Sequence, residues 1–202
     1  MFFLSLQQVL LNIVAAGVVG SVYGFTAAAM AAALGDYGPK RDGRRTVSPI
    51  SHFGALGFLA MMLFRMGWIR PVDVRPKEAR AGRWAPVGVV AGGMAALLLL
   101  AFAANALRPV ALQLLSGNAG LTVSAALNTI VMTSLGTAVL NLLPLPPLAG
   151  GLLWRTVHTT TAQRLESIAR YIAIAVFVVL VTSGAVGVLN EWRTALRAWL
   201  GM

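Results

Sequence analysis

The stretch that decides the fold is Asn141-Leu-Leu-Pro144-Leu-Pro146-Pro147-Leu-Ala149-Gly150-Gly151, which follows a long apolar run. Proline has no amide donor and cannot continue a helix, so this stretch predicts a helix that breaks at or inside a membrane. The carbonyl groups just upstream lose their partners, and the Asn141 side chain can satisfy part of that backbone. The Gly150-Gly151 pair permits a sharp turn.

The composition around this stretch is that of a membrane protein. Of the 202 residues, 58% are hydrophobic and 11% are charged, and the mean hydropathy is +0.79. A soluble domain carries about a quarter charged residues, and a disordered chain has few apolar ones, so both classes are excluded. At this length we expect a single membrane domain, residues 1–202. The chain has no cysteine, which excludes disulfides and thiolate metal sites.

The charge balance is strongly basic, with 16 Lys and Arg against six Asp and Glu, a net charge of +10. Most basic residues lie between apolar runs, which favours contact with anionic lipid headgroups over nucleic acid. We therefore expect membrane lipids as partners and no nucleic acid. The basic residues expected to face lipid or a partner protein are Lys40, Arg41, Arg44, Arg45, Arg70, Arg75, Lys77, Arg80 and Arg83.

Apolar runs of about 20 residues predict an all-α, multi-pass protein with about five transmembrane or re-entrant helices. The predicted spans are residues 9–34, 53–68, 85–106, 121–143 and 168–189. The first run is too long for a removable signal peptide and lacks its charge and cleavage pattern. In the segment 191–200, Trp192, Leu196 and Trp199 share one helical face. That spacing suits either an interfacial helix or an aromatic anchor of the last span.

The orientation in the membrane stays open. If all five runs cross, the basic segments 35–52 and 69–84 lie on opposite sides, and the positive-inside rule favours neither orientation. A re-entrant or partly inserted segment within residues 35–68 would remove this conflict. Arg65 lies near the end of the short second run, where snorkelling to headgroups is favoured over a buried ion pair.

Small residues recur every four positions along the first run, and such stripes let membrane helices approach closely. Polar residues in the fourth run predict either a groove for another membrane helix or an internal hydrogen-bonded seam. The candidates for helix packing or partner binding are Ala16, Gly20, Gly24, Ala28, Ala32, Asn128, Asn141, Pro144 and Pro146.

The broken-helix stretch resembles a motif of the site-2 protease family, the intramembrane zinc metalloproteases. The family pattern there is Asn-x-x-Pro-x-Pro-x-Leu-Asp-Gly, in which the Asp is the third zinc ligand. Four upstream blocks also resemble the family, in the same order and over about two thirds of the chain. They are YGFTAAAMAAALGD (residues 23–36), GRRTVSP with His52 (residues 43–52), GWIRPV (residues 67–72) and Ala91-Gly92. The resemblance implies a site-2-protease-like helical core.

The departures from the family pattern fall on its catalytic residues. On this register Tyr23 and Ala27 hold the positions of the two histidines of His-Glu-x-x-His, and Gly24 replaces the general-base Glu. Ala149 replaces the Asp ligand. Catalytic zinc needs three protein ligands, and its water needs a base. His52 and His158 fall one ligand short of a new site, and the family itself has a non-catalytic His at the position of His52.

We therefore expect no catalytic residue, no metal and no cofactor. The favoured function is a structural or regulatory subunit that binds other transmembrane helices in a larger complex, in a bacterial inner or cytoplasmic-type membrane. The alternative is a metalloprotease with a rebuilt, non-standard active site. A transporter is disfavoured because ionisable residues that could relay ions are nearly absent from the predicted spans. If Tyr23 is buried, its hydroxyl needs a partner, and Asn141 or carbonyls near Pro144 are the candidates.

Overall fold

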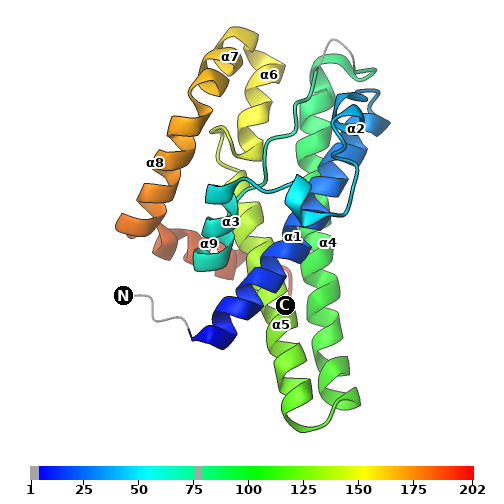
Figure 1. Ribbon diagram of the computed structural model, residues 1–202, viewed down its shortest axis with the longest axis vertical. Coiled ribbons are helices and arrows are strands. Elements are labelled where there is room, and N and C mark those ends of the chain that lie inside the picture. Colours follow the sequence, from blue (N-terminus) through cyan, green and yellow to red (C-terminus); the bar gives the residue numbers. More distant parts are fainter. Residues whose placement is uncertain (1–4, 76–78) are drawn as a thin grey trace.

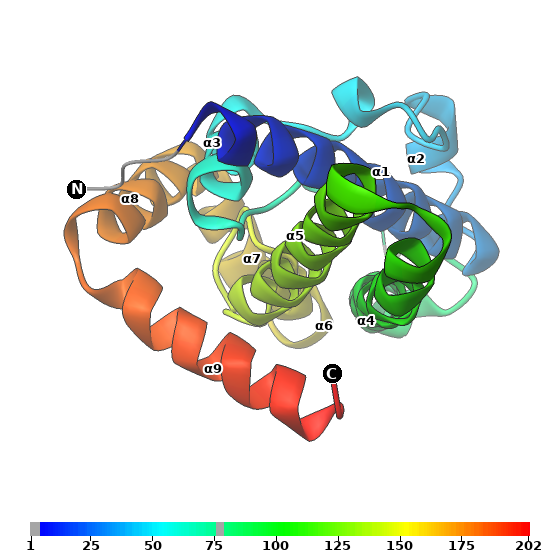
Figure 2. The same ribbon diagram turned by 90° about the horizontal axis from the view of Figure 1, so that it is seen from below.

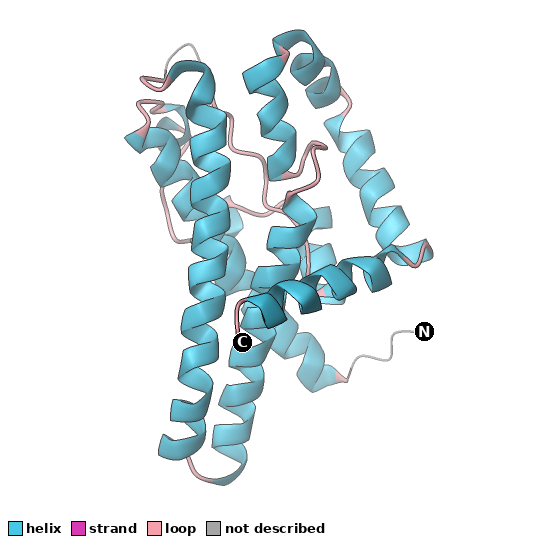
Figure 3. Ribbon diagram, turned by 180° about the vertical axis from the view of Figure 1, so that it is seen from behind, coloured by secondary structure: helices cyan, strands magenta, loops and turns pink. Residues whose placement is uncertain are grey.

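The computed structural model describes residues 5–75 and 79–202, and all regular secondary structure in these ranges is helical (Figure 1, Figure 3). Three helices that pack together are long and apolar enough to cross a membrane: α1 (Leu6–Ala33), α4 (Ala85–Leu114) and α5 (Gly117–Asn141). The pair α7 (Thr159–Ser167) and α8 (Ala169–Thr182), bent by 65°, is a fourth candidate. The all-α membrane fold is confirmed, with three or four candidate spans.

The second predicted span contains only a short helix, whose length does not reach across a membrane. Helix α3 (Ala55–Phe64) has 10 residues and is about 15 Å long, half the thickness of the hydrocarbon core. It ends at Arg65, whose backbone is left-handed with φ 55°, and residues 66–75 that follow are not helical. α3 packs against α1 and α8, so it is held inside the bundle in the manner of a re-entrant segment.

Local signals move several other helix ends away from the predicted bounds. α1 begins three residues before the predicted span because Ser5 and Gln8 form a capping box. α4 runs past Pro109 to Leu114, beyond the predicted end at 106. The predicted last span, 168–189, is wrong at its C-terminal end, because the helix stops at Thr182 and a new helix starts at Ala185.

Short elements connect the long helices. They are α2 (Gly38–Arg41), η1 (Pro49–Ser51), η2 (Gly82–Trp84), η3 (Ala149–Leu153) and α6 (Trp154–Val157). η3 and α6 resume the course of α5 after the proline-rich break (Figure 1).

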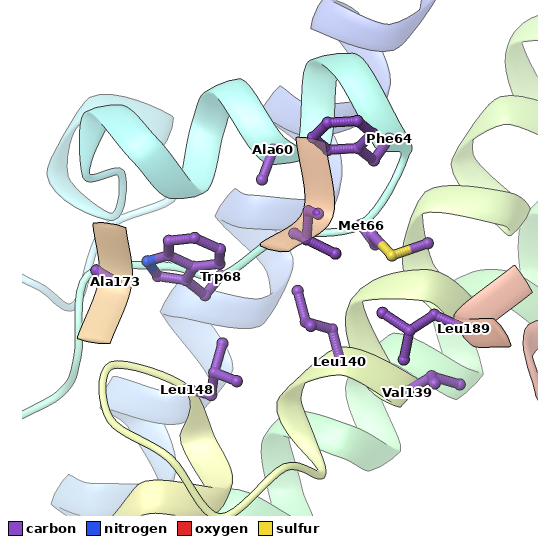
Figure 4. Packing of buried hydrophobic residues seen from close by; sticks show 10 residues of the cluster. Ala60, Phe64, Met66, Trp68, Val139, Leu140, Leu148, Ala173 and Leu189 are labelled. Atoms are coloured by element: carbon purple, nitrogen blue, oxygen red, sulfur yellow. The ribbon is translucent and has the colours of Figure 1, made fainter. Parts of the chain in front are cut away.

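A buried cluster ties the two halves of the chain together beside this break. Trp68 and Leu148 lie near Leu140, with Ala173 of α8 and Leu189 at the edge of the same cluster (Figure 4). The cluster thus joins the segment after α3 to the end of α5 and to the last two helices. This contact positions the proline-rich stretch against residues 66–72.

The two basic segments lie at the same end of the molecule. Figure 1 places α2, the start of α4 and α7 together at the top. The buried guanidinium of Arg44 donates hydrogen bonds to the carbonyl groups of Arg70 (2.6 Å) and Pro71, which joins one basic segment to the other. Arg44 is therefore a structural residue and not the lipid-facing or partner-facing one expected, because its side chain satisfies an extended backbone.

The other basic residues predicted to face lipid or a partner are exposed, except for Lys77, which lies outside the described residues. Those exposed are Lys40, Arg41, Arg45, Arg70, Arg75, Arg80 and Arg83. Arg75 forms an ion pair with Asp73 at 3.3 Å.

Helix α9 (Ala185–Trp199) crosses one side of the bundle at a steep angle to α8 (Figure 2, Figure 3). It packs against α5. The predicted face is only partly the one used: Trp192 and Trp199 are exposed, whereas Leu196 packs inward together with partly buried Arg193 and Arg197. The aliphatic stems of the arginines make this possible.

Candidate functional site

The helix break is held by a single side chain, Asn141, at the end of α5. Its Nδ2 donates to the carbonyl groups of Gly67 (2.7 Å) and Thr137 (2.8 Å), and its Oδ1 accepts from the amide of Ala149 (3.1 Å). Asn141 is 1% exposed, so these bonds are shielded from water. The three bonds link α5, the chain after α3 and the start of η3, and they satisfy backbone groups on both sides of the break.

An internal cavity of about 20 Å³ lies beside this junction. Tyr23 and Ala27 of α1 line it together with Ala149, so the structure brings together three of the four positions that the family resemblance marks. The remaining lining is Asn141 and apolar residues, namely Ile69, Pro71, Val72, Val89, Val90, Pro147, Leu148 and Leu152. Ligand clefts usually measure about 300–1,000 Å³, whereas this volume is close to that of one water molecule.

Tyr23 is 2% exposed and fills the space between α1 and α4. A Cβ atom on Gly93 would lie 2.5 Å from its ring, so Gly93 is what allows the tyrosine to fit. No described residue forms a hydrogen bond with the Tyr23 hydroxyl. The expected bond to Asn141 or to carbonyls near Pro144 is therefore wrong, because the Asn141 amide is already used by backbone groups.

Gly24, the fourth marked position, does not line the cavity and instead contacts His52. A Cβ atom on Gly24 would overlap the imidazole ring, so His52 occupies the space that a longer side chain at position 24 would need. His52 is fully buried, and its Nε2 is 2.7 Å from the carbonyl oxygen of Thr46. Burial lowers the pKa of His52, partly offset by the bond to Thr46, and nearby Arg44 lowers it further. The imidazole is therefore neutral at pH 7.

The small-residue stripe of α1 packs inside this chain. Phe53 lies over Gly20 as His52 lies over Gly24, with a ring atom 2.6 Å from where a Cβ on Gly20 would be. Phe53 also stacks edge-on against Phe58 of α3, with 4.9 Å between ring centroids. Gly20 and Gly24 thus hold the segment before α3. All five members of the stripe are buried within this chain: Ala16, Gly20, Gly24, Ala28 and Ala32.

The polar residues of α5 also face inward. Thr133, Ser134 and Thr137 are fully buried, and their hydroxyls have no hydrogen-bond partner among the described residues. Asn128 is half-buried, Pro146 is buried and Pro144 is exposed. The inward position of these residues is that expected of an internal seam, but the three unpaired hydroxyls do not form the hydrogen bonds that this alternative requires.

The residues at this site do not fit a zinc ion. Zinc is held by His, Cys, Asp or Glu, and the cavity offers one tyrosine hydroxyl, one amide and methyl groups. Within residues 5–75 and 79–202, no three His, Asp or Glu side chains come together. His52 is packed against α1, and His158 lies exposed at the start of α7.

Two sets of contacts made by carboxylates near the site were not predicted from the sequence. Arg155 of α6 makes a two-point contact with Glu166 at 2.6 and 2.8 Å, pairs with Asp73 at 2.8 Å and donates to the carbonyl of Val74. Buried Asp36 accepts from the amides of Gly38 (2.9 Å) and Arg75 (2.6 Å). The available sequence signal is the small number of acidic residues. With six Asp and Glu against 16 Lys and Arg, each carboxylate is expected to form a structural contact.

Comparison with known proteins supports a relationship to metalloproteases. The Bacillus subtilis (strain 168) protein named "Putative zinc metalloprotease YwhC" is 32% identical to this chain over 125 residues, which are 58% of this chain and 55% of that protein. The match thus covers about half the length of the curated relative. No family model matches the chain, and no solved structure matches it.

Proposed function

We propose that this chain is a catalytically inactive, site-2-protease-like membrane protein that serves as a structural or regulatory subunit and binds other transmembrane helices. The observation that carries the proposal is the side-chain chemistry around the break in α5. Where the family resemblance places a zinc ligand set, Tyr23, Ala27 and Ala149 surround a cavity of about 20 Å³. A cavity of that size cannot hold a peptide bond together with a metal and a water.

The packing of His52 on Gly24 supports the same conclusion. A general base must reach the reacting water, and the space next to position 24 is filled by the imidazole. Because the imidazole is held by the Thr46 carbonyl and lies outside the cavity lining, it does not substitute for the missing carboxylate.

The surface for a partner helix is the outward face of α1. A shallow hollow there is lined by Val18, Val22 and Phe25 together with Ser21, Thr26 and Val47. Polar side chains within membrane helices usually face other helices. Ser21 and Thr26 make no hydrogen bond with the described residues, so their hydroxyls can contact a helix from another protein.

Metal analysis of the purified full-length chain tests the loss of catalysis. We expect zinc well below stoichiometric amounts, even after incubation with zinc and removal of the excess. Stoichiometric zinc that is lost when Tyr23 is replaced by Phe would contradict the proposal and favour the rebuilt metalloprotease.

Native purification in a mild detergent, followed by mass spectrometry, tests the subunit role. We expect a transmembrane protein in a fixed ratio to this chain, and Val22→Trp should reduce its recovery several-fold by filling the hollow. Leu99→Trp is the matched control, because Leu99 is 70% exposed on α4, away from the hollow. A chain that emerges alone and monomeric would refute the subunit role.

A further inference from the structure

Three arginines converge where α5 meets α9 and the end of α3. In Figure 1, α9 crosses the bundle at about the level of α3 and above the turn between α4 and α5. Gly136 of α5 is the meeting point: a Cβ atom there would lie 2.5 Å from the carbonyl oxygen of Arg65 and 3.5 Å from Cδ of Arg193. One turn earlier, the guanidinium of Arg197 lies 3.9 Å from the sulfur of Met132. Arg65, Arg193 and Arg197 are called the arginine cluster below.

Two members of the arginine cluster, Arg65 and Arg193, have no counterion among the described residues. Two nitrogens of Arg193, Nε and Nη1, are buried and have no hydrogen-bond partner among the described residues. Arg65 donates to neutral Asn12 at 3.0 Å. Arg197 differs, because it donates to a main-chain oxygen of Met202, the last residue of the sequence, at 3.2 Å. Burial lowers the pKa of Arg193, and the charges of Arg65 and Arg197 lower it further.

The described carboxylates are all engaged or directed elsewhere. Asp36 binds backbone amides, and Asp73 and Glu166 bind Arg155. Asp42 follows α2 at the opposite end, and Glu191 is exposed on α9. A partly buried cation without a partner is costly, so an anion from outside the chain would stabilise the cluster.

The depth of the cluster matches a membrane surface. Leu196 and Leu200, next to the arginines, pack against a buried cluster made of Ala101 and Ala104 of α4 and of Val131 and Leu135 of α5. At 1.5 Å per residue, Ala104 lies about 28 Å along α4 from its start at Ala85, close to the hydrocarbon thickness of about 30 Å. Trp192 and Trp199, which are 56% and 82% exposed, flank the arginines, and tryptophan favours the headgroup level.

We propose that Arg65, Arg193 and Arg197 bind the phosphate group of an anionic phospholipid at this membrane surface, opposite the surface where the basic loops lie. A guanidinium binds phosphate through N–H bonds, and the partly buried guanidinium of Arg193 carries donors that no described residue uses. The arginine stems lie against α5 while their charged ends reach the headgroup level. The site does not depend on whether the chain is an enzyme.

Lipid-dependent thermal unfolding of the full-length chain in a non-ionic detergent tests this site. Phosphatidylglycerol is titrated against phosphatidylcholine and inorganic phosphate at the same concentrations. We expect only phosphatidylglycerol to raise Tm, and Arg193→Gln with Arg197→Gln to weaken its apparent affinity by about 10- to 100-fold, as expected for the loss of charge-assisted hydrogen bonds. The matched control is Arg164→Gln with Arg170→Gln, because both residues are exposed, form no ion pair with the described residues and lie outside the basic loops; it should retain the full response.

The proposal would be overturned if phosphatidylcholine raised Tm as much as phosphatidylglycerol does, or if the variant with Arg193→Gln and Arg197→Gln kept the full response to phosphatidylglycerol. An equal loss of that response in the control variant would also overturn it. A response to inorganic phosphate alone would assign the site to a free anion and would also overturn the lipid assignment. If the double variant does not fold, Arg65→Gln provides the same comparison, because Arg65 is only partly buried.

Discussion

His52 fills the space beside Gly24 that the family resemblance assigns to a catalytic carboxylate. The contact depends on the absence of a Cβ atom at position 24 and on the bond that fixes the imidazole to the Thr46 carbonyl. A side chain at position 24 would therefore have to displace a buried ring. Reintroducing Glu at this position alone would disrupt packing before it could act as a base.

Substitution of Gly24 by Ala tests this packing. We expect Gly24→Ala to lower the free energy of unfolding by about 1–3 kcal/mol through overpacking, measured by reversible denaturant unfolding in detergent micelles. Gly17→Ala on the same helix is the control, since a Cβ at Gly17 meets nothing within 4 Å. It should leave stability unchanged or raise it by up to about 1 kcal/mol through helix propensity. Equal effects of the two changes would disprove the contact with His52.

For individual residues, the sequence identifies the positions that the family resemblance marks but not the contacts that the side chains there make. Tyr23, Ala27 and Ala149 could be identified from the motif register, and the structure places them around one cavity. The roles of Arg44 and Arg193 could not be predicted, because a structural arginine and a lipid-facing one look alike between apolar runs. Arg44 binds carbonyls 26 and 27 residues away, and no local pattern indicates such a pairing.

Among the elements, α6 and α7 are tied to the chain before α4 by one side chain. Arg155, 19% exposed, joins Glu166 of α7 to Asp73. The hydrogen bond to Glu166 raises the pKa of Arg155, against the effect of burial. Burial would raise the pKa of Asp73, but the bonds and charges of Arg155 and Arg75 outweigh it and lower the pKa.

Loss of Arg155 should loosen this connection. We expect Arg155→Gln to lower the free energy of unfolding by about 1–3 kcal/mol, and Arg155→Lys to restore only part of it because an ammonium cannot make the two-point contact. Because its pKa is lowered, Asp73 stabilises the native chain above its unfolded pKa, and this contribution is lost as the pH falls through the folded pKa. The decrease in the free energy of unfolding at low pH should therefore be smaller in Arg155→Gln than in the unchanged chain. Exposed Arg164→Gln is the control, and an effect equal to that of Arg155→Gln would contradict the connection.

The long helices could be predicted from hydrophobicity, whereas the short ones could not. Runs of about 20 apolar residues predicted α1, α4 and α5. Most of the predicted helix ends lie within a few residues of the observed ones, and the C-terminal end of α4 is the exception. The 16-residue run 53–68 fits either a short span or a buried helix. Its outcome, a 10-residue helix, depends on the left-handed backbone at Arg65 and on packing against α8, which lies far away in sequence.

For the whole molecule, the fold of residues 34–84 resolves the conflict between the two basic segments. Because α3 is too short to cross, both segments lie at one end, and from the positive-inside rule we expect that end to face the cytoplasm.

The absence of native cysteine makes this orientation directly testable. Single cysteines at Lys40 and Arg83 should react with a membrane-impermeant maleimide from the same side of the membrane. A cysteine at Asn118, exposed at the start of α5, should react from the other side. Labelling of positions 40 and 83 from opposite sides would show that the segment between them crosses the membrane.

The short length of α3 also sets an order for assembly during synthesis. The insertion machinery need not carry the arginines of residues 35–84 across the bilayer, a transfer that would cost about 2.5–3.5 kcal/mol for each charge at the membrane centre. Because α3 has only 10 residues, it cannot enter the membrane as an independent span. One of its two helical neighbours, α8, leaves the ribosome only after α4 and α5. The apolar surface of α3 therefore stays incompletely covered until the last quarter of the chain has been made, which is the interval in which a chaperone would be needed.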